Sequence, residues 1–278
     1  MNLKTLKDTP PWGWPEGTGK ALLGILRDDR PSESDLLLAT ELAGDFTVIN
    51  DELADALLSI LRSGDRPEEV RGGAAISLGP VLEHVDMEGF EDPDELPITE
   101  RTFHRIQESL RTLYMDANVP RDVRRRILEA SVRAPQDWHP DAVRALYASD
   151  DEVWRLTAVF CMRFVRGFDA QILEALNSRN PDLRYEAVLA AGNWEVDAAW
   201  PHVAALVTSA ETEKSLLLAA IDAAASIRPH DAPELLDDLA DSDDEDIADA
   251  VHEALAMAEG PSGEDEDDEL DDDDDARR

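Results

Sequence analysis

The sequence predicts an all-α protein, a solenoid built from stacked helix pairs. Three observations favour this fold class: one sequence window recurs along the chain, each copy has the apolar spacing of a helix with one buried face, and a second apolar helical segment precedes the copies. A single helix pair is too small to bury both of its apolar faces, so successive pairs must stack on one another.

The recurring windows are spaced by about one helix pair. The clearest copy is VRGGAAISLG, which starts at Val70. A leading apolar residue is usually followed by small or aliphatic residues four and five places later and often by another at eight, which is the stripe of a helix that packs through one face. The spacings are 32, 53, 31, 29, 33 and 31 residues, because the windows begin at residues 38, 70, 123, 154, 183, 216 and 247.

Each window is predicted to be the second helix of a pair. The first helices are expected in the apolar segments 51–64, 141–149, 169–178, 197–207 and 232–241. Asp, Asn and Ser stand just ahead of several second helices, in SDDEVW, NPDLRY and SDDEDI, where they suit the free amides and the dipole of a helix N-terminus.

The entry segment, residues 1–15, leads into a stretch that resembles a phosphate-binding loop, WPEGTGKALL. A Walker loop needs Gly where this chain has Trp14, and Ser or Thr where it has Ala21. The sequence therefore predicts no nucleotide site here. We expect Trp12 and Trp14 to cover the open apolar end of the first repeat.

The 53-residue spacing indicates an insertion of roughly 22 residues near 87–100. This stretch, MEGFEDPDELPITE, is acidic, contains Pro and lacks helical periodicity. Loops of this length are uncommon in compact domains, so a disordered spacer and a binding loop both remain open.

The last segment, residues 260–278, has 11 acidic and 2 basic residues and almost no apolar content. Such a composition predicts a disordered tail that is extended by its own charge. The repeat region is accordingly expected to span residues 16–259.

The pattern V-R-x-x-A-A-x-x-L-G resembles the HEAT repeat. In that family an Arg follows the leading apolar residue, and it usually bonds to turns of the adjacent repeat. Four windows match at this place and three depart from it, the matches being Arg71, Arg124, Arg155 and Arg184 and the departures Leu217, Ala248 and Ala39. The resemblance implies an α-α superhelix of about seven helix pairs, and the relatives include scaffolds, alkylpurine DNA glycosylases and phycobilin lyases.

Charge and composition limit the class of protein. The net charge of −37 disfavours binding to nucleic acid or to an anionic membrane, and it is also typical of an acidic proteome. The lone cysteine, Cys161, excludes a disulfide framework and lies in an apolar window, which predicts a core thiol. No signal peptide or membrane helix is indicated. We expect a cytoplasmic monomer.

No catalytic, cofactor or metal site is indicated by the sequence. DSDDED (241–246) begins like a calcium loop, but Asp246 and His252 stand where an EF-hand needs Gly and Glu, so a helix cap is predicted. The six histidines lack metal-ligand spacing. We therefore expect a protein that is not an enzyme and has no cofactor.

An arginine-rich band interrupts the acidic chain. Residues 101–166 hold 12 of the 22 arginines against nine acidic residues. The candidate partner-binding residues are Arg121, Arg124, Arg125, Arg126, Arg163 and Arg166. They could seat an anionic partner segment through bidentate contacts, be occupied by the protein's own tail, or form ion pairs between repeats.

The aromatic residues near this band are expected to be structural. Trp154 and Phe160 occupy the helical stripe, whereas Trp194 and Trp200 flank a turn. An exposed one among these tryptophans would become a candidate contact.

These features favour a protein-interaction scaffold or adaptor with a protein partner, because solenoids offer long binding surfaces. Two alternatives come from other classes. The chain could be an enzyme or enzyme subunit acting on a base or chromophore, or an acidic decoy that binds basic proteins through its tail.

Overall fold

The computed structural model describes residues 2–28, 32–93 and 95–259. In these ranges all regular structure is helical, which confirms the all-α fold class. All seven recurring windows begin inside the second helix of a pair, as predicted. The tail at 260–278 lies outside the described residues.

The chain forms two compact units. Unit 1 comprises residues 1–171 and contains four helix pairs, α2/α3, α4/α5, α7/α8 and α9/α10. Its elements are α1 (Leu3–Lys7), η1 (Pro11–Gly13), α2 (Thr18–Leu26), α3 (Glu33–Leu42), α4 (Asp51–Arg62), α5 (Glu68–Ile76), α6 (Gly79–Glu88), α7 (Glu100–Met115), α8 (Arg121–Ser131), α9 (His139–Tyr147) and α10 (Glu152–Cys161).

Unit 2 comprises residues 172–278 and contains the pairs α11/α12, α13/α14 and α15/α16. Its elements are most of α11 (Asp169–Leu176), α12 (Pro181–Asn193), η2 (Asp197–Ala199), α13 (Trp200–Thr208), α14 (Lys214–Ile227), α15 (Ala232–Ala240) and α16 (Glu245–Glu259).

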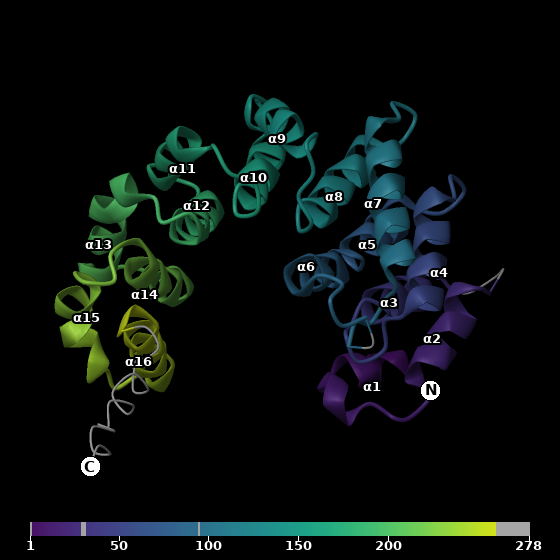
Figure 1. Cartoon of the computed structure of the whole chain (residues 1–278), viewed down its shortest axis with the longest axis horizontal. Helices are drawn as coiled ribbons and strands as arrows, with labels where there is room; N and C mark the ends of the chain where they lie inside the picture. Colours follow the sequence, from purple (N-terminus) through teal and green to yellow (C-terminus); the bar gives the residue numbers. More distant parts are fainter. Residues whose placement is uncertain (1, 29–31, 94, 260–278) are drawn as a thin grey trace, which may run out of the picture. The chain divides into compact units, whose positions relative to one another are not determined.

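Within each unit the second helices pack side by side. In unit 1, α3, α5, α8 and α10 follow one another in one layer, while α2, α4 and α7 form the layer behind them (Figure 1). In unit 2, α12, α14 and α16 form the corresponding layer. We call these the second-helix layers of unit 1 and unit 2.

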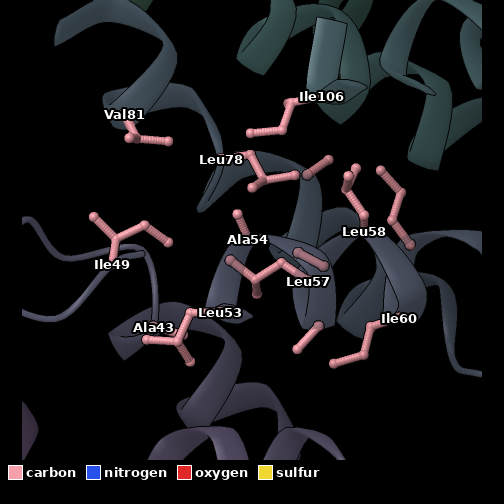
Figure 2. Packing of buried hydrophobic residues seen from close by; sticks show 14 of the residues in the cluster. Ala43, Ile49, Leu53, Ala54, Leu57, Leu58, Ile60, Leu78, Val81 and Ile106 are labelled. Carbon is pink, nitrogen blue, oxygen red and sulfur yellow. The ribbon is translucent and has the colours of Figure 1, made fainter. Parts of the chain in front are cut away.

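The core of unit 1 is one apolar cluster that runs through successive pairs. Figure 2 shows its centre, where Leu53 and Leu57 of α4 lie near Leu78, just before α6, and Ile106 of α7. All four are fully buried. Each such side chain contributes about 1.5–3 kcal/mol of transfer free energy.

The insertion begins earlier than the sequence predicts. It consists of a complete extra helix, α6, followed by the loop 89–99. The insertion begins early because α6 starts directly after the turn that ends α5. The loop is also anchored: Ile98 is buried, and Thr99 donates from its amide (2.9 Å) and hydroxyl (3.0 Å) to the Asp51 carboxylate. The end of this loop is therefore held against α4, while the choice between a spacer and a binding loop stays open.

The two entry tryptophans have different roles. Trp14 packs against the core cluster, and its Nε1 donates to the carbonyls of Leu6 (3.0 Å) and Thr9 (2.9 Å). Trp12 is 86% exposed, so the expectation that it covers the end of the repeat is wrong. The short helix α1 places Leu3 and Leu6 in the core instead.

Side-chain caps begin the second helices as predicted. Asp151 accepts from the amide of Val153 at α10, and Asn180 accepts from the amides of Asp182 and Leu183 at α12. At α16, Asp244 accepts from the Asp246 amide (3.1 Å), which supports a helix cap for DSDDED.

Two of the four repeat arginines reach back to the first helix of their own pair. Arg71 is buried and its Nε donates to the Leu61 carbonyl near the end of α4 (3.0 Å). Arg155 lies over the ring of Tyr147 at the end of α9 (5.3 Å). These contacts tie the two helices of one pair together, whereas the resemblance implied bonds to the next repeat.

Replacement of Gly44 by Ala is expected to destabilise unit 1. A Cβ at this position would lie 2.9 Å from the Ser77 Cα and closer still to the Ser77 carbonyl oxygen, so backbone must shift. Overpacking of this kind costs about 1–3 kcal/mol. Urea unfolding followed by circular dichroism should show a lower midpoint.

The matched control is Gly24→Ala in α2. No atom lies within 4 Å of a Cβ built there, and Gly24 is exposed in a helix interior, so this variant should gain about 0.5–1 kcal/mol. Equal midpoints for the two variants would contradict the packing argument.

Candidate functional site

The first residue of α8, Arg121, is an exposed cation on an aromatic surface. Its guanidinium carbon lies 4.3 Å from the centre of the Trp154 ring, which belongs to the next second helix, α10. Trp154 is half-buried, so part of its ring remains accessible beside the arginine. Among the described residues Arg121 has no carboxylate partner.

Arg124, one turn further along α8, is half-buried. Its Nε is buried and has no hydrogen-bond acceptor in the described part of the chain. Burial raises the pKa of Tyr114, with a contribution from Cys161, and the charge of Arg124 opposes this rise. Arg124 therefore lies within electrostatic range of the Tyr114 hydroxyl, at the end of α7.

Arg125 and Arg126 serve a buried carboxylate. Glu129 of the same helix accepts from Arg125 Nη1 (2.8 Å) and Arg126 Nη1 (2.7 Å). Thr157 of α10 donates its hydroxyl to Glu129 (2.6 Å) and lies 3.2 Å from Arg125 Nη1. This network joins α8 to α10, and it accounts for Arg125 as an internal ion pair. Arg126 keeps 45% of its side chain exposed.

Arg163 and Arg166 follow the last residue of α10. Arg121 is the first residue of α8, so it lies near the opposite ends of the helices in this layer. The guanidinium of Arg163 lies 5.5 Å from the ring of Phe160 and 5.6 Å from that of Phe164. Arg166 is exposed in the same turn.

The sequence analysis missed Arg133, which approaches the same two rings. Its guanidinium lies 5.6 Å from Phe160 and 5.3 Å from Phe164, and it forms an ion pair with Glu83 of α6. Its place in the turn after α8 corresponds to that of Arg163 after α10, so repeat register could have identified it.

The six predicted arginines thus form a band rather than one cluster, with four of them on α8 and Arg163 and Arg166 after α10. A helix of 11 residues is about 16 Å long, which separates Arg121 at one end from the Arg133 and Arg163 pair at the other. An extended peptide of about five residues spans that length. A band of this kind can bind carboxylates or phosphates along a segment, because guanidinium groups form bidentate hydrogen bonds with both.

The remaining candidate groups are buried. Cys161 is a fully buried free thiol, as predicted. His139 at the start of α9 is also fully buried; its Nδ1 accepts from the Gln136 amide (2.8 Å) and its Nε2 lies 3.0 Å from the Ser131 hydroxyl. Burial lowers the pKa of His139 to about 3, so the ring is neutral and Nε2–H donates to Ser131.

The sequence matches no protein-family model and no curated protein. Several solved structures have a similar fold. Human deoxyhypusine hydroxylase is 18% identical, with 92% of this chain and 88% of that chain covered and a TM-score of 0.40. The E. coli protein YibA is 16% identical, over 87% of this chain and 82% of its own, with a TM-score of 0.46. An engineered protein is 16% identical, over 88% and 97%, with a TM-score of 0.36.

These similarities concern the helical fold alone, because every identity is below 20% and every TM-score is below 0.5. They also correct one expectation. The expectation that the protein is not an enzyme is contradicted, because deoxyhypusine hydroxylase, to which the chain is similar at low identity, is an enzyme.

A membrane-spanning segment is not found among the helices of the described ranges, since none has the required length and apolar character. Within the same ranges, no three or more His, Cys, Asp or Glu side chains gather in a way that could hold a metal ion.

The buried His139 should make stability depend on pH. Its pKa is about 3 in the folded chain and about 6.5 when unfolded, so the unfolded state binds more protons below pH 6.5. Stability from this group is fully present above pH 6.5 and falls by about 1.4 kcal/mol per pH unit below it, or about 2 kcal/mol between pH 7 and pH 5.

Urea midpoints of the native chain and of His139→Gln, measured at pH 7, 6 and 5, test this expectation. The native chain should lose more stability on acidification than the variant. His230→Gln is the control, because His230 is an exposed histidine in the turn after α14. Parallel curves for the native chain and His139→Gln would contradict the assignment.

Proposed function

We propose that this chain is a HEAT-repeat protein that binds an acidic segment of a partner protein on the second-helix layer of unit 1. The contact is centred on Arg121 and Arg124. One observation carries the proposal: Arg121 lies over Trp154 as an exposed guanidinium with no carboxylate partner among the described residues.

The stacked geometry prepares Arg121 for binding. A guanidinium held against an aromatic ring has lost part of its rotational freedom before the partner arrives, so less entropy is lost on contact. Its edge remains open to a carboxylate, while the Trp154 ring offers apolar area beside it. Aromatic and Arg residues of this kind commonly dominate binding energy in protein interfaces.

The internal ion pairs determine which arginines are available to contact the partner segment. Arg125 is held by Glu129 and Thr157, so it supports the layer and is not a contact. Arg124 has an unsatisfied Nε and the exposed half of Arg126 lies one residue past Arg125. Arg163 and Arg166 would extend the contact toward the end of α10.

An acidic protein segment fits this band better than nucleic acid does. The chain carries a net charge of −37, which repels a long polyanion. A short carboxylate-bearing segment feels mainly the local charge, since the Debye length is about 8 Å at physiological salt. The local net charge around the band is positive, because residues 101–166 contain 12 arginines and nine acidic residues.

Arg121→Gln is expected to weaken binding of an acidic probe about tenfold, because a charge-assisted hydrogen bond contributes about 1.5–3 kcal/mol. The probe is a short fluorescein-labelled peptide of alternating glutamate and glycine, and binding to the full chain is followed by fluorescence anisotropy at about 0.15 M salt. Trp154→Leu should weaken binding in the same direction.

Arg144→Gln is the matched control. Arg144 lies on α9, is mostly exposed and pairs with Asp141, so the variant has the same net charge as Arg121→Gln without touching the band. If both variants lost the same affinity for the peptide, the effect would come from net charge alone, and the proposal would be refuted. A single-stranded oligonucleotide that binds more tightly than the peptide would refute the choice of partner.

An enzyme or enzyme subunit is the second candidate class. The observation that favours it is a cavity in unit 2 with several polar side chains, since a small substrate needs an enclosed site. An acidic decoy would act through residues 260–278, which lie outside the described residues; binding of an oligolysine probe that is lost on deleting them would support that alternative. A cytoplasmic location and a monomeric state stay predictions.

A further inference from the structure

Unit 2 contains a cavity of about 820 Å³ between two of its helix pairs. Its walls come from the end of α11, the first turn of α12, one face of α13, the loop 209–213 and the start of α14. Cavities of about 300–1,000 Å³ are the size that encloses small-molecule ligands. This site lies in a different unit from the arginine band and is independent of the proposed function.

The cavity arises from how α12 and α14 pack. Near the end of α12 the two helices approach closely, because a Cβ on Gly192 would lie only 3.1 Å from the Ala223 Cα. The cavity is lined instead by the first residues of both helices, such as Pro181 and Ser215. The helices therefore converge at one end and leave space at the other.

Three polar side chains that line this cavity have no protein partner in the described part of the chain. They are Arg184, Tyr185 and His202. The Nε of Arg184 is buried and lacks an acceptor. An unsatisfied buried donor costs about 1–3 kcal/mol, so an anionic ligand oxygen at Arg184 would be stabilised by removing that cost.

Arg184 differs in this respect from the equivalent arginine of an earlier repeat. Arg71 occupies the same place in its window and donates its Nε to a carbonyl of the preceding helix (3.0 Å). Arg184 makes no such bond and lines an open space instead. Arg184 thus lacks the structural contact that Arg71 makes, and the cavity adjoins it.

The rest of the lining selects the type of ligand. Asp182, Glu211 and Glu213 add negative charge, and the Ser215 hydroxyl and amide lower the pKa of Glu213, which keeps it ionised. Apolar surface comes from Leu176, Leu206 and Leu216 among others. A dianion such as phosphate would be repelled by the three carboxylates, whereas a zwitterion would satisfy both signs of charge.

We propose that this cavity binds a short peptide with free termini, whose α-carboxylate contacts Arg184 and whose ammonium group contacts the carboxylates of Asp182, Glu211 and Glu213. Tyr185 and His202 supply further hydrogen bonds to the carboxylate or the peptide groups. Apolar side chains of the peptide pack on the leucines. A tripeptide fits within the volume of the cavity.

Isothermal titration calorimetry of the full chain with alanyl-leucyl-alanine tests the proposal. We expect saturable binding, a loss of about tenfold or more for the C-terminal amide, and a similar loss for the N-acetylated peptide, because each charged hydrogen bond contributes about 1.5–3 kcal/mol. Binding of all three peptides with equal affinity, or no binding of the free tripeptide, would overturn it.

Variants of the lining residues test whether the tripeptide binds in this cavity. Arg184→Gln should abolish the preference for the free carboxylate over the amide, while Arg179→Gln should keep it, since Arg179 is exposed just before α12 and does not line the cavity. Tyr185→Phe removes only a hydroxyl and should weaken binding without unfolding the unit. Unchanged binding in Arg184→Gln, or tighter binding of inorganic phosphate than of the tripeptide, refutes the site as proposed.

Discussion

Close contact between neighbouring second helices is the constraint on which the rest of this fold depends. In unit 2 it is met at Gly192 of α12 against Ala223 of α14, and in unit 1 at Gly72 of α5, where a Cβ would lie 3.1 Å from the Arg126 Cγ of α8. Small residues at these places let helices approach within contact distance, and the aliphatic stems of arginines then pack on the exposed backbone. The same constraint determines where neighbouring second helices leave open space that side chains can line. The cavity of unit 2 lies where that approach ends.

The fold could be predicted from the sequence because stacking imposes a period. An apolar residue with small residues four and five places later recurs whenever a second helix must meet its neighbour, so the seven windows and their caps were visible. The insertion was misplaced for a physical reason. The residues of α6 continue directly from those of α5, and its Gly-Pro start looks like a turn in sequence but begins a helix, because Pro suits the first turn. Trp12 was misjudged because a tryptophan pair carries no sign of which ring turns inward.

The candidate site was predictable in composition but not in detail. Arginine density located the band along α8, yet four neighbouring positions have different roles. Arg125 and Arg126 have an acidic residue four and three places ahead, Glu129, so their pairing could have been anticipated. The third member of that network, Thr157, comes from the next repeat and could not. Whether Arg121 would meet Trp154 likewise depended on the rotation of α10 against α8, which only three-dimensional packing fixes.

The repeat also explains how one structural position can acquire a function. An arginine after the leading apolar residue of a second helix can satisfy a carbonyl of the first helix, as Arg71 does, and it then stabilises the pair. Where that acceptor is not met, as at Arg124 and Arg184, a buried Nε remains without a partner. Such a group is costly to the fold, so it is tolerated best where a ligand or partner can supply the missing oxygen. Arg124 lies in the band of unit 1 and Arg184 lines the cavity of unit 2. Each proposed site therefore includes an arginine from this repeat position whose Nε lacks an acceptor among the described residues.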